Sequence, residues 1–349
     1  MTDKKVLSRN SNLELYRIIL MLLIIAHHYV VNSPLMNVIV ENPTLKESIF
    51  LWLFGMWGKT GINCFLMITG YFMCCQQITL RKFLKLFFEV LFYNIVIYSI
   101  FVLFGYQEVS LKNIFHVIVP IRFIRDGFIS CFLVFYLFIP FLNILIKNMN
   151  KKEHALLILL CVVMYSMFGT LPGFGVSMNY VSWFCVVYFI ASYIRLYGLL
   201  DKVTHSQWGG VTLLSVVLSM LSAIGLIFIN KFPYHLVNIN GPMAIIVAVS
   251  SFMYFKDLKI RQSAFINALG ASTFGVLVIH GNSDTMRTWL WKDTMDNLSY
   301  YSSPFLILHA IAAVLVVYIV CTAIDYVRIK VIEIPLFNYL DKNLFSKNN

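Results

Sequence analysis

The chain has 349 residues, of which 60% are hydrophobic and only 12% are charged, and its mean hydropathy is +0.79. A water-soluble domain of this length cannot bury so much apolar surface behind a polar shell. The formal net charge of +11 is explained by basic segments that adhere to anionic lipid, and no nucleic-acid-binding motif accompanies it. The composition therefore excludes a soluble globular protein and predicts an integral membrane protein that binds no nucleic acid.

Ten apolar segments are each expected to cross the membrane as an α-helix. In chain order they cover residues 13–32, 51–73, 83–104, 127–146, 155–170, 180–198, 210–230, 239–255, 264–281 and 304–326. The segments are continuous and about 20 residues long, whereas a barrel would show alternating stretches of about ten. The first run lacks a small-residue cleavage site and should remain as the first span. The predicted fold class is all-α: a polytopic helical bundle of about ten transmembrane helices, forming one membrane domain over residues 1–349 with no soluble extracytoplasmic domain.

The basic residues set the predicted orientation. With the N-terminus in the cytoplasm, most of the 27 lysines and arginines fall in cytoplasmic segments, as the positive-inside rule requires. Both termini are then cytoplasmic, and the chain is expected in the cell membrane as a multi-pass protein. The seven cysteines are scattered through apolar runs without metal-ligand spacing. They are interpreted as small core residues, and no metal is expected.

Two ionisable residues lie in the first apolar run. Arg17 and His28 are separated by ten residues, and eleven steps of about 100° bring both to one helix face, about 16 Å apart. Charged groups are costly inside a membrane, which favours a functional role. His27 projects about 100° away from this face. Two other interpretations stay open, because Arg17 also fits a side chain that snorkels to the rim beside Glu14, and His27 fits a packing role.

The predicted topology separates two polar clusters. His28, Lys59, Asn63 and His280 fall in the outer half, whereas Arg17 and Arg81 fall at the inner boundary. Histidine is the usual general base at neutral pH, and arginine makes bidentate bonds to phosphate. This arrangement suits a reaction that takes acyl-coenzyme A from the cytoplasm and delivers the acyl group near the outer surface. Arg81 equally fits a positive-inside signal, and Lys59 or His280 equally fits the cap of a neighbouring helix.

Several stretches resemble the integral-membrane acyltransferase-3 family, which includes bacterial O-acetyltransferases of cell-envelope and exported polysaccharides. The spacing of Arg17 and His28 matches the Arg-x10-His signature of that family, and the matches continue through nearly the whole chain. The other similar stretches are Gly58-Lys-Thr-Gly-Ile-Asn-Cys-Phe-Leu-Met-Ile-Thr-Gly-Tyr-Phe72, Pro140-Phe-Leu-Asn143, Ser272-Thr-Phe-Gly-Val-Leu-Val-Ile-His280 and Asp325-Tyr-Val-Arg-Ile-Lys330 before Glu333 and Pro335.

The resemblance implies that His28 is the essential base, Arg17 its partner on the donor side, and Arg81 the basic residue at the entry to the third span. Two departures are visible. Thr69 stands where the family more often has Ser, and Gly127-Phe-Ile-Ser-Cys-Phe132 lacks the Trp-rich entry of relatives. No hydrolase-like domain is appended, so the chain is expected to complete the transfer itself or to pass the group to a separate protein.

The resulting hypothesis is a membrane O-acyltransferase, most simply an O-acetyltransferase. It would move an acyl group from cytoplasmic acetyl-CoA to a hydroxyl of an envelope or exported glycan. His28 and Arg17 would be the catalytic residues, and Arg17 and Arg81 would bind the donor. Lys59, Asn63 and His280 are candidate contacts for the oxyanion or the acceptor. The expected partners are a glycan or lipid-linked glycan, membrane lipid and envelope-biosynthesis proteins. The alternatives are a non-enzymatic flippase or exporter of lipid-linked sugars, and a glycan polymerase.

Overall fold

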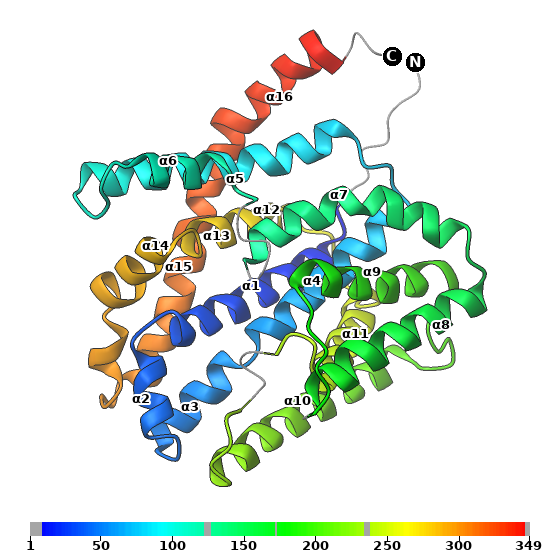
Figure 1. Ribbon diagram of the computed structural model, residues 1–349, viewed down its shortest axis with the longest axis horizontal. Helices are drawn as coiled ribbons and strands as arrows, with labels where there is room; N and C mark the ends of the chain where they lie inside the picture. Colours follow the sequence, from blue (N-terminus) through cyan, green and yellow to red (C-terminus); the bar gives the residue numbers. More distant parts are fainter. Residues whose placement is uncertain (1–8, 122–126, 172, 234–237, 346–349) are drawn as a thin grey trace.

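The computed structural model describes residues 9–121, 127–171, 173–233 and 238–345, and in these residues all regular structure is helical (Figure 1). Helices α8, α14, α15 and α16 each continue into a short π-helical turn. The helices are α1 (Ser11–Val31), α2 (Leu35–Glu41), α3 (Lys46–Gly55), α4 (Gly58–Met73), α5 (Leu80–Leu103), α6 (Leu111–Ile118), α7 (Phe128–Lys147), α8 (Lys151–Val162), α9 (Tyr180–Tyr197), α10 (His205–Phe228), α11 (Pro242–Lys256), α12 (Ala264–Ala271), α13 (Thr273–His280), α14 (Asp284–Thr288), α15 (Leu306–Arg328) and α16 (Ile334–Leu340).

The all-α membrane bundle predicted from the sequence is confirmed. Within the described residues, seven helical segments are long and apolar enough to cross a membrane, and an eighth results if the pair Ala264–His280 and Asp284–Thr294, bent by 97°, is one span. The two other expected segments, 155–170 and 239–255, correspond to the 12-residue α8 with its π-helical turn and to the 15-residue α11. The count of ten and the orientation of the termini remain predictions.

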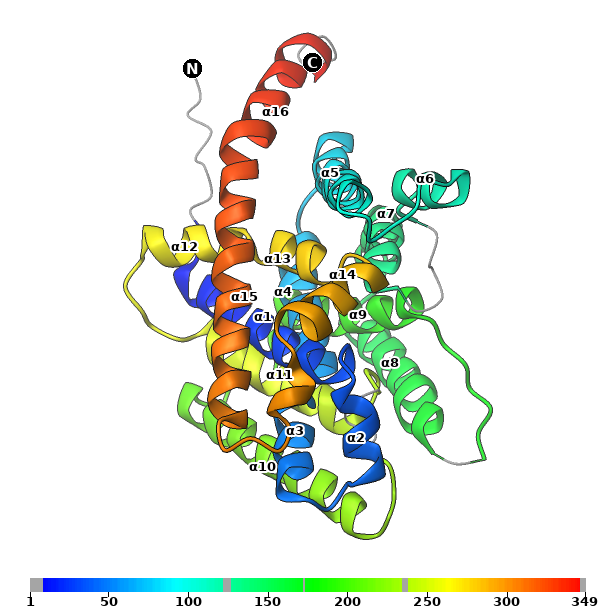
Figure 2. The ribbon, with the colours of Figure 1, turned by 90° about the vertical axis from the view of Figure 1, so that its left-hand side faces the viewer.

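Helix α1 lies at the centre of the bundle, against α3, α4, α12 and α15 (Figure 2). Its sequence is apolar on nearly every side, which is typical of a helix surrounded by others. The side chains of Met21 and Ile24, which lie on the helix face between Arg17 and His28, are buried. That face is therefore packed along its middle rather than open to a long ligand.

A buried ion-pair network joins α5 to the end of α15. The buried Arg328 contacts three carboxylates, from Glu89 at 3.0 Å and from Asp325 and Glu333 at 2.8 Å. Lys85 adds a 2.7 Å contact to Glu333. Because each buried charge would be costly alone, this network fixes α5 against α15. Arg328, Asp325 and Glu333 belong to the closing motif that the sequence singled out.

Candidate active site

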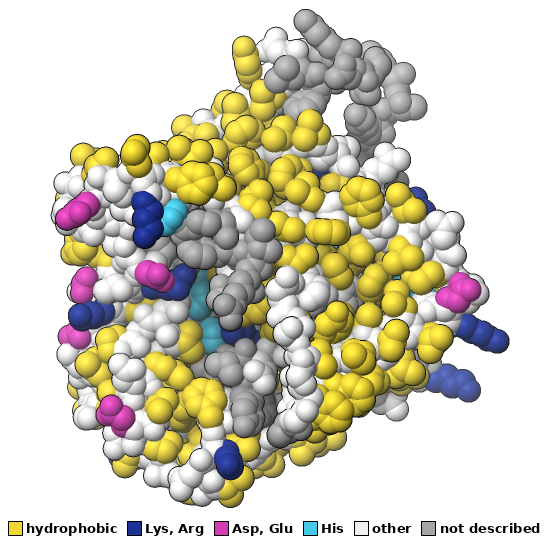
Figure 3. All heavy atoms as spheres, in the orientation of Figure 1, with side chains coloured by type: hydrophobic (Ala, Val, Ile, Leu, Met, Phe, Trp, Pro, Cys, Tyr) yellow, Lys and Arg dark blue, Asp and Glu magenta, His cyan; other side chains and the backbone are white. Residues whose placement is uncertain are grey.

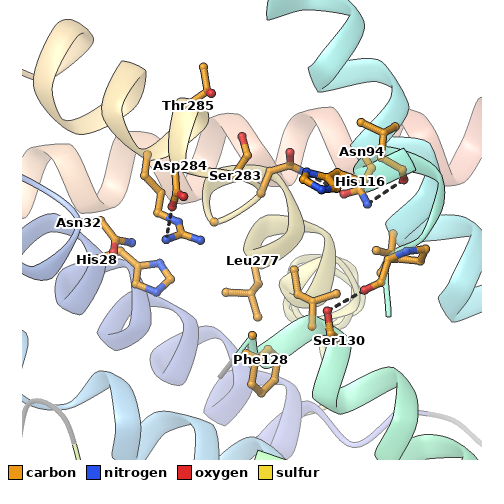
Figure 4. Close-up of a pocket in the computed structure, with 18 of the residues that line it drawn as sticks. His28, Asn32, Asn94, His116, Phe128, Ser130, Leu277, Ser283, Asp284 and Thr285 are labelled. Carbon is orange, nitrogen blue, oxygen red and sulfur yellow. Dashed lines mark hydrogen bonds and ion pairs between the residues drawn. The ribbon is translucent and has the colours of Figure 1, made fainter. Parts of the chain in front are cut away.

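A cavity of about 490 Å³ opens at the end of α1 that carries His28. It is lined by residues of α1, α4, α5, α6, α7, α9, α13 and α14. Figure 3 shows histidine side chains in a hollow on this face, with basic and acidic side chains beside it. In Figure 4, His28 and Asn32 lie on one side of the cavity, and Asn94, His116 and Ser130 lie on the other. Polar groups from distant parts of the chain thus converge on His28.

The ring of His28 is held by a second histidine. Nδ1 of His28 lies 2.9 Å from Nε2 of His280, and Nδ1 of His280 lies 2.6 Å from the carbonyl oxygen of Val276. A carbonyl only accepts, so Nδ1 of His280 carries a proton and, in a neutral ring, its Nε2 accepts. Nδ1 of His28 must then donate to His280. In the neutral pair this leaves Nε2 of His28 with a free lone pair, which is the form that a general base requires.

Local breaks in the helices bring the two histidines together. His280 is the last residue of α13, and the chain turns by 97° before α14 begins. The side chain of His280 is completely buried, whereas that of His28 is partly exposed at the cavity wall. Of the two rings, His28 is therefore the one placed to meet a ligand, and His280 supports it from behind.

His27 has a structural contact. Its side chain is 5% exposed, and Nδ1 donates to the carbonyl oxygen of Gly55 at 2.8 Å. The start of α4 packs directly on this ring, because a Cβ added at Gly58 would collide with His27. His27 is among the residues that line the cavity. Its hydrogen bond, however, joins α1 to the last residue of α3, just before α4 begins. This geometry matches the packing interpretation that the sequence left open.

Lys59 lies in the cavity wall at the start of α4. Its Nζ donates to the hydroxyl of Tyr180 at 2.6 Å, and no carboxylate of the described residues lies within ion-pair distance of it. An ammonium group that lacks a carboxylate partner leaves positive charge in the cavity for a negatively charged group of a ligand or of a transition state. The sequence predicted Lys59 as a contact but not Tyr180, the first residue of α9, because a tyrosine side chain carries no charge that would single it out.

The remaining polar residues of the wall were not among the predicted site residues. Their side chains are paired across elements: Asn282 donates to Asn94 at 2.9 Å and Gln107 donates to Thr285 at 2.6 Å. Arg287 forms an ion pair with the exposed Asp284 at 3.0 Å. Asn94 lies within an apolar span, where a polar side chain indicates a candidate functional residue. The others lie between the apolar segments predicted from the sequence, where polar residues are ordinary.

Asn63, the third expected outer contact, does not reach the cavity. Its side-chain amide is 1% exposed, donates to the carbonyl oxygen of Ile239 at 2.7 Å and accepts from Nε1 of Trp183 at 2.8 Å. Both groups of the amide are therefore used to join α4 to α9 and to the chain before α11. Of the expected outer contacts, the structure brings Lys59 and His280 to His28 but not Asn63.

The two arginines expected to bind the donor lie away from this cavity. Arg17 donates to the buried Glu14 at 3.0 Å, and Glu14 also pairs with Arg9 at 3.1 Å. Arg81 makes a bidentate contact with Asp341 at 2.6 and 2.8 Å. Both guanidinium groups are partly exposed, at 26% and 42% of the side chain. The partner Glu14 was foreseen from the sequence, but Asp341 was not, because 260 residues separate it from Arg81.

The sequence was also compared with known proteins. The family model described as an acyltransferase domain matches residues 10–326, which include every site residue discussed above except Arg9 and Asp341. No curated protein and no solved structure gave a match. This membership, together with the apolar helices, identifies a membrane acyltransferase. The chain belongs to the acyltransferase-3 family.

Proposed function

We propose that this protein is an O-acetyltransferase that moves the acetyl group of cytoplasmic acetyl-CoA to a hydroxyl of an envelope or exported glycan. The observation that carries the proposal is the orientation of His28, whose Nδ1 is bound to His280 while its Nε2 is left for the cavity. A histidine at a cavity wall that donates to a second, carbonyl-bound histidine is arranged as a base with a fixed tautomer.

In the proposed reaction, Nε2 of His28 takes the proton of the acceptor hydroxyl while the hydroxyl oxygen attacks the thioester carbonyl. The carbon–sulfur bond then breaks, and the departing thiolate of coenzyme A takes the proton from His28. His280 accepts from Nδ1 throughout and stabilises the charged ring. Lys59 supports the proposal because its ammonium group, in the same cavity, suits the negative charge that develops on the carbonyl oxygen.

The acceptor side of the proposal rests on the chemistry of the cavity wall. Amide and hydroxyl side chains, among them Asn94, Asn282 and Thr285, supply both donors and acceptors, as the hydroxyl groups of a sugar require. Arg287 and Lys59 add positive charge near His28. Such a wall fits a polyhydroxylated acceptor better than an apolar one.

The donor side rests on Arg17 and Arg81. The contact of Arg17 with Glu14 uses one amino group, and Arg81 pairs with a partly exposed carboxylate that a phosphate can replace. Because Met21 and Ile24 fill the face between Arg17 and His28, the pantetheine arm must displace these side chains to bring the thioester to His28. The proposal therefore includes a rearrangement of this face when the donor binds.

The test uses native membranes that contain the full chain, supplied with acetyl-CoA labelled in the acetyl group. Alkali-labile label should accumulate in the glycan fraction with equimolar release of free coenzyme A, and His28→Ala should abolish both. Gly175→Ala, in an exposed loop with no neighbouring atoms, is the matched control and should behave as the natural chain. Release of coenzyme A without label in glycan would reject a glycan acceptor, and equal labelling with His28→Ala would reject the mechanism.

A further inference from the structure

Helix α6 has two unlike faces. Leu111, Phe115 and Ile118 recur at helical spacing and form one stripe, and they are 88%, 57% and 53% exposed. The opposite face carries Asn113, His116 and Val117, all of which line the cavity. None of the eight residues of α6 is buried. The helix thus covers the cavity with its polar face and presents an apolar stripe outward, which reverses the usual arrangement of a surface helix in water.

The position of α6 along α5 sets its depth. Tyr98 of α5 donates to the carbonyl oxygen of Glu108, just before α6, and Asn94 donates to the carbonyl oxygen of Val117 near its end. The chain therefore turns after α5 and runs back beside it, with contacts at Tyr98 and Asn94 that lie about 6 Å apart along the axis of α5. Figure 1 and Figure 2 show the two helices side by side at the edge of the bundle. Since α5 is one of the membrane-spanning segments, α6 lies beside the half of a span that adjoins the cavity.

The end of α5 also exposes apolar side chains. Ile100, Leu103 and Phe104 at the end of α5 are 45%, 81% and 75% exposed. No element of the described chain covers either set of side chains. Near the N-terminal end of α6, the exposed Lys112 has no ion-pair partner among the described residues and suits a lipid phosphate. Within one leaflet of a bilayer, the exposed apolar side chains beside the span suit the lipid acyl chains. The neighbouring cation suits the headgroups.

We propose that α6 is embedded in the leaflet on the cavity side of the membrane, with Leu111, Phe115 and Ile118 against lipid acyl chains and with Asn113 and His116 closing the cavity. Eight residues span only about 12 Å, so α6 enters the leaflet without crossing the bilayer. Groups at both ends of α6 have partners, since the hydroxyl of Ser110 accepts from the amide of Asn113 and Asn94 donates to the carbonyl oxygen of Val117, which favours this placement in hydrocarbon. A single amphipathic helix then forms the wall between the active-site cavity and the lipid.

Site-directed spin labelling tests this placement. A nitroxide is attached at single cysteines in a variant that lacks the seven native cysteines, reconstituted in phosphatidylcholine–phosphatidylglycerol vesicles. Labels at Leu111→Cys, Phe115→Cys and Ile118→Cys should collide with oxygen more than with a neutral nickel chelate. Labels at Asn113→Cys and His116→Cys, on the same helix, should show the reverse preference. Preference for the chelate along the stripe would overturn the proposal, and spin–spin broadening there would assign the stripe to a second copy of the chain.

A photocrosslinking experiment in the natural background keeps the proposal testable if a cysteine variant fails to fold. Benzoylphenylalanine at position 115 should give adducts with the mass of phospholipid after illumination, whereas the same residue at position 116 should give markedly fewer. Equal phospholipid yields at the two positions would contradict the two-faced arrangement. Because neither readout involves acetyl transfer, this proposal can fail or succeed independently of the proposed reaction.

Discussion

His28 and His280, which are 252 residues apart in the sequence, form a hydrogen bond of 2.9 Å between Nδ1 of the first ring and Nε2 of the second. The bond of His280 to the carbonyl oxygen of Val276 fixes the direction of the whole chain of hydrogen bonds. It turns the lone pair of His28 toward the cavity. The function of this membrane acyltransferase is therefore expected to depend on two histidines with different tasks.

The first prediction separates the two neighbouring histidines of α1. His28→Ala should lower the transfer rate on the order of 10²- to 10⁴-fold, because the general base is lost. His27→Ala should retain substantial activity per folded molecule, since the hydrogen bond of His27 to the carbonyl oxygen of Gly55 is a structural contact between α1 and α3. Labelled acetyl transfer, normalised to the amount of monodisperse protein, measures both. A complete loss of activity in properly folded His27→Ala would contradict the assignment.

The second prediction concerns His280 as a positioning residue. His280→Leu removes the acceptor for Nδ1 of His28 and should lower kcat by about 10²-fold, with little change in the KM for acetyl-CoA. His280→Gln offers a carbonyl acceptor in its place and should recover part of the lost kcat. The dependence of kcat on pH provides a second readout, because without His280 the ring of His28 is no longer held in a single tautomer. Equal activity of the Leu and Gln variants would show that the hydrogen bond does not matter.

The third prediction tests the donor site. Replacing Arg17 or Arg81 with Lys keeps the charge but loses bidentate geometry, so the affinity for acetyl-CoA should fall. Lys82→Arg is the matched control and should leave affinity unchanged, since the side chain of Lys82 donates to Gln76 and to the backbone of Gln77 and forms no ion pair with a described carboxylate. Equilibrium binding of acetyl-CoA to purified protein measures all three. If both Lys variants bind acetyl-CoA as tightly as the natural protein, the interpretation of Arg17 as a snorkelling residue and of Arg81 as a positive-inside signal would be favoured.

The fourth prediction concerns stability. Arg328→Met leaves the carboxylates of Glu89, Asp325 and Glu333 without their shared cation, and should destabilise the fold by about 3–5 kcal/mol. Arg195→Met, at an exposed site, should cost at most about 1 kcal/mol. Thermal unfolding in one detergent compares the two variants. Similar melting temperatures would mean that the buried network contributes little.

The fifth prediction tests the orientation. In a cysteine-free background, cysteines at Asn42, Gly175 and Ser299 should react with an impermeant maleimide in intact cells, because these exposed positions lie in predicted outer loops. Cysteines introduced at Gln77, Lys151 and Lys259 should react only after the membrane is opened. The reverse pattern would move the cavity to the cytoplasmic side, and the acetyl group would then not need to cross the bilayer.

The sequence by itself determined the class of fold and the family, and it predicted His28 as the catalytic base. A continuous apolar segment in a membrane has few alternatives to an α-helix, because each backbone polar group must form its hydrogen bond within the segment. The spacing of Arg17 and His28 on one helix face follows from helix geometry alone. Local rules of this kind need no knowledge of neighbouring helices.

Only the tertiary structure decided which of the polar residues act together. Asn63 and Lys59 are four residues apart on α4, yet Asn63 binds Trp183 in the core while Lys59 faces the cavity with Tyr180. Arg81 meets Asp341, and the face between Arg17 and His28 is filled by Met21 and Ile24. Such contacts depend on how helices pack and where they break, and a hydrophobic sequence pattern contains little information about either.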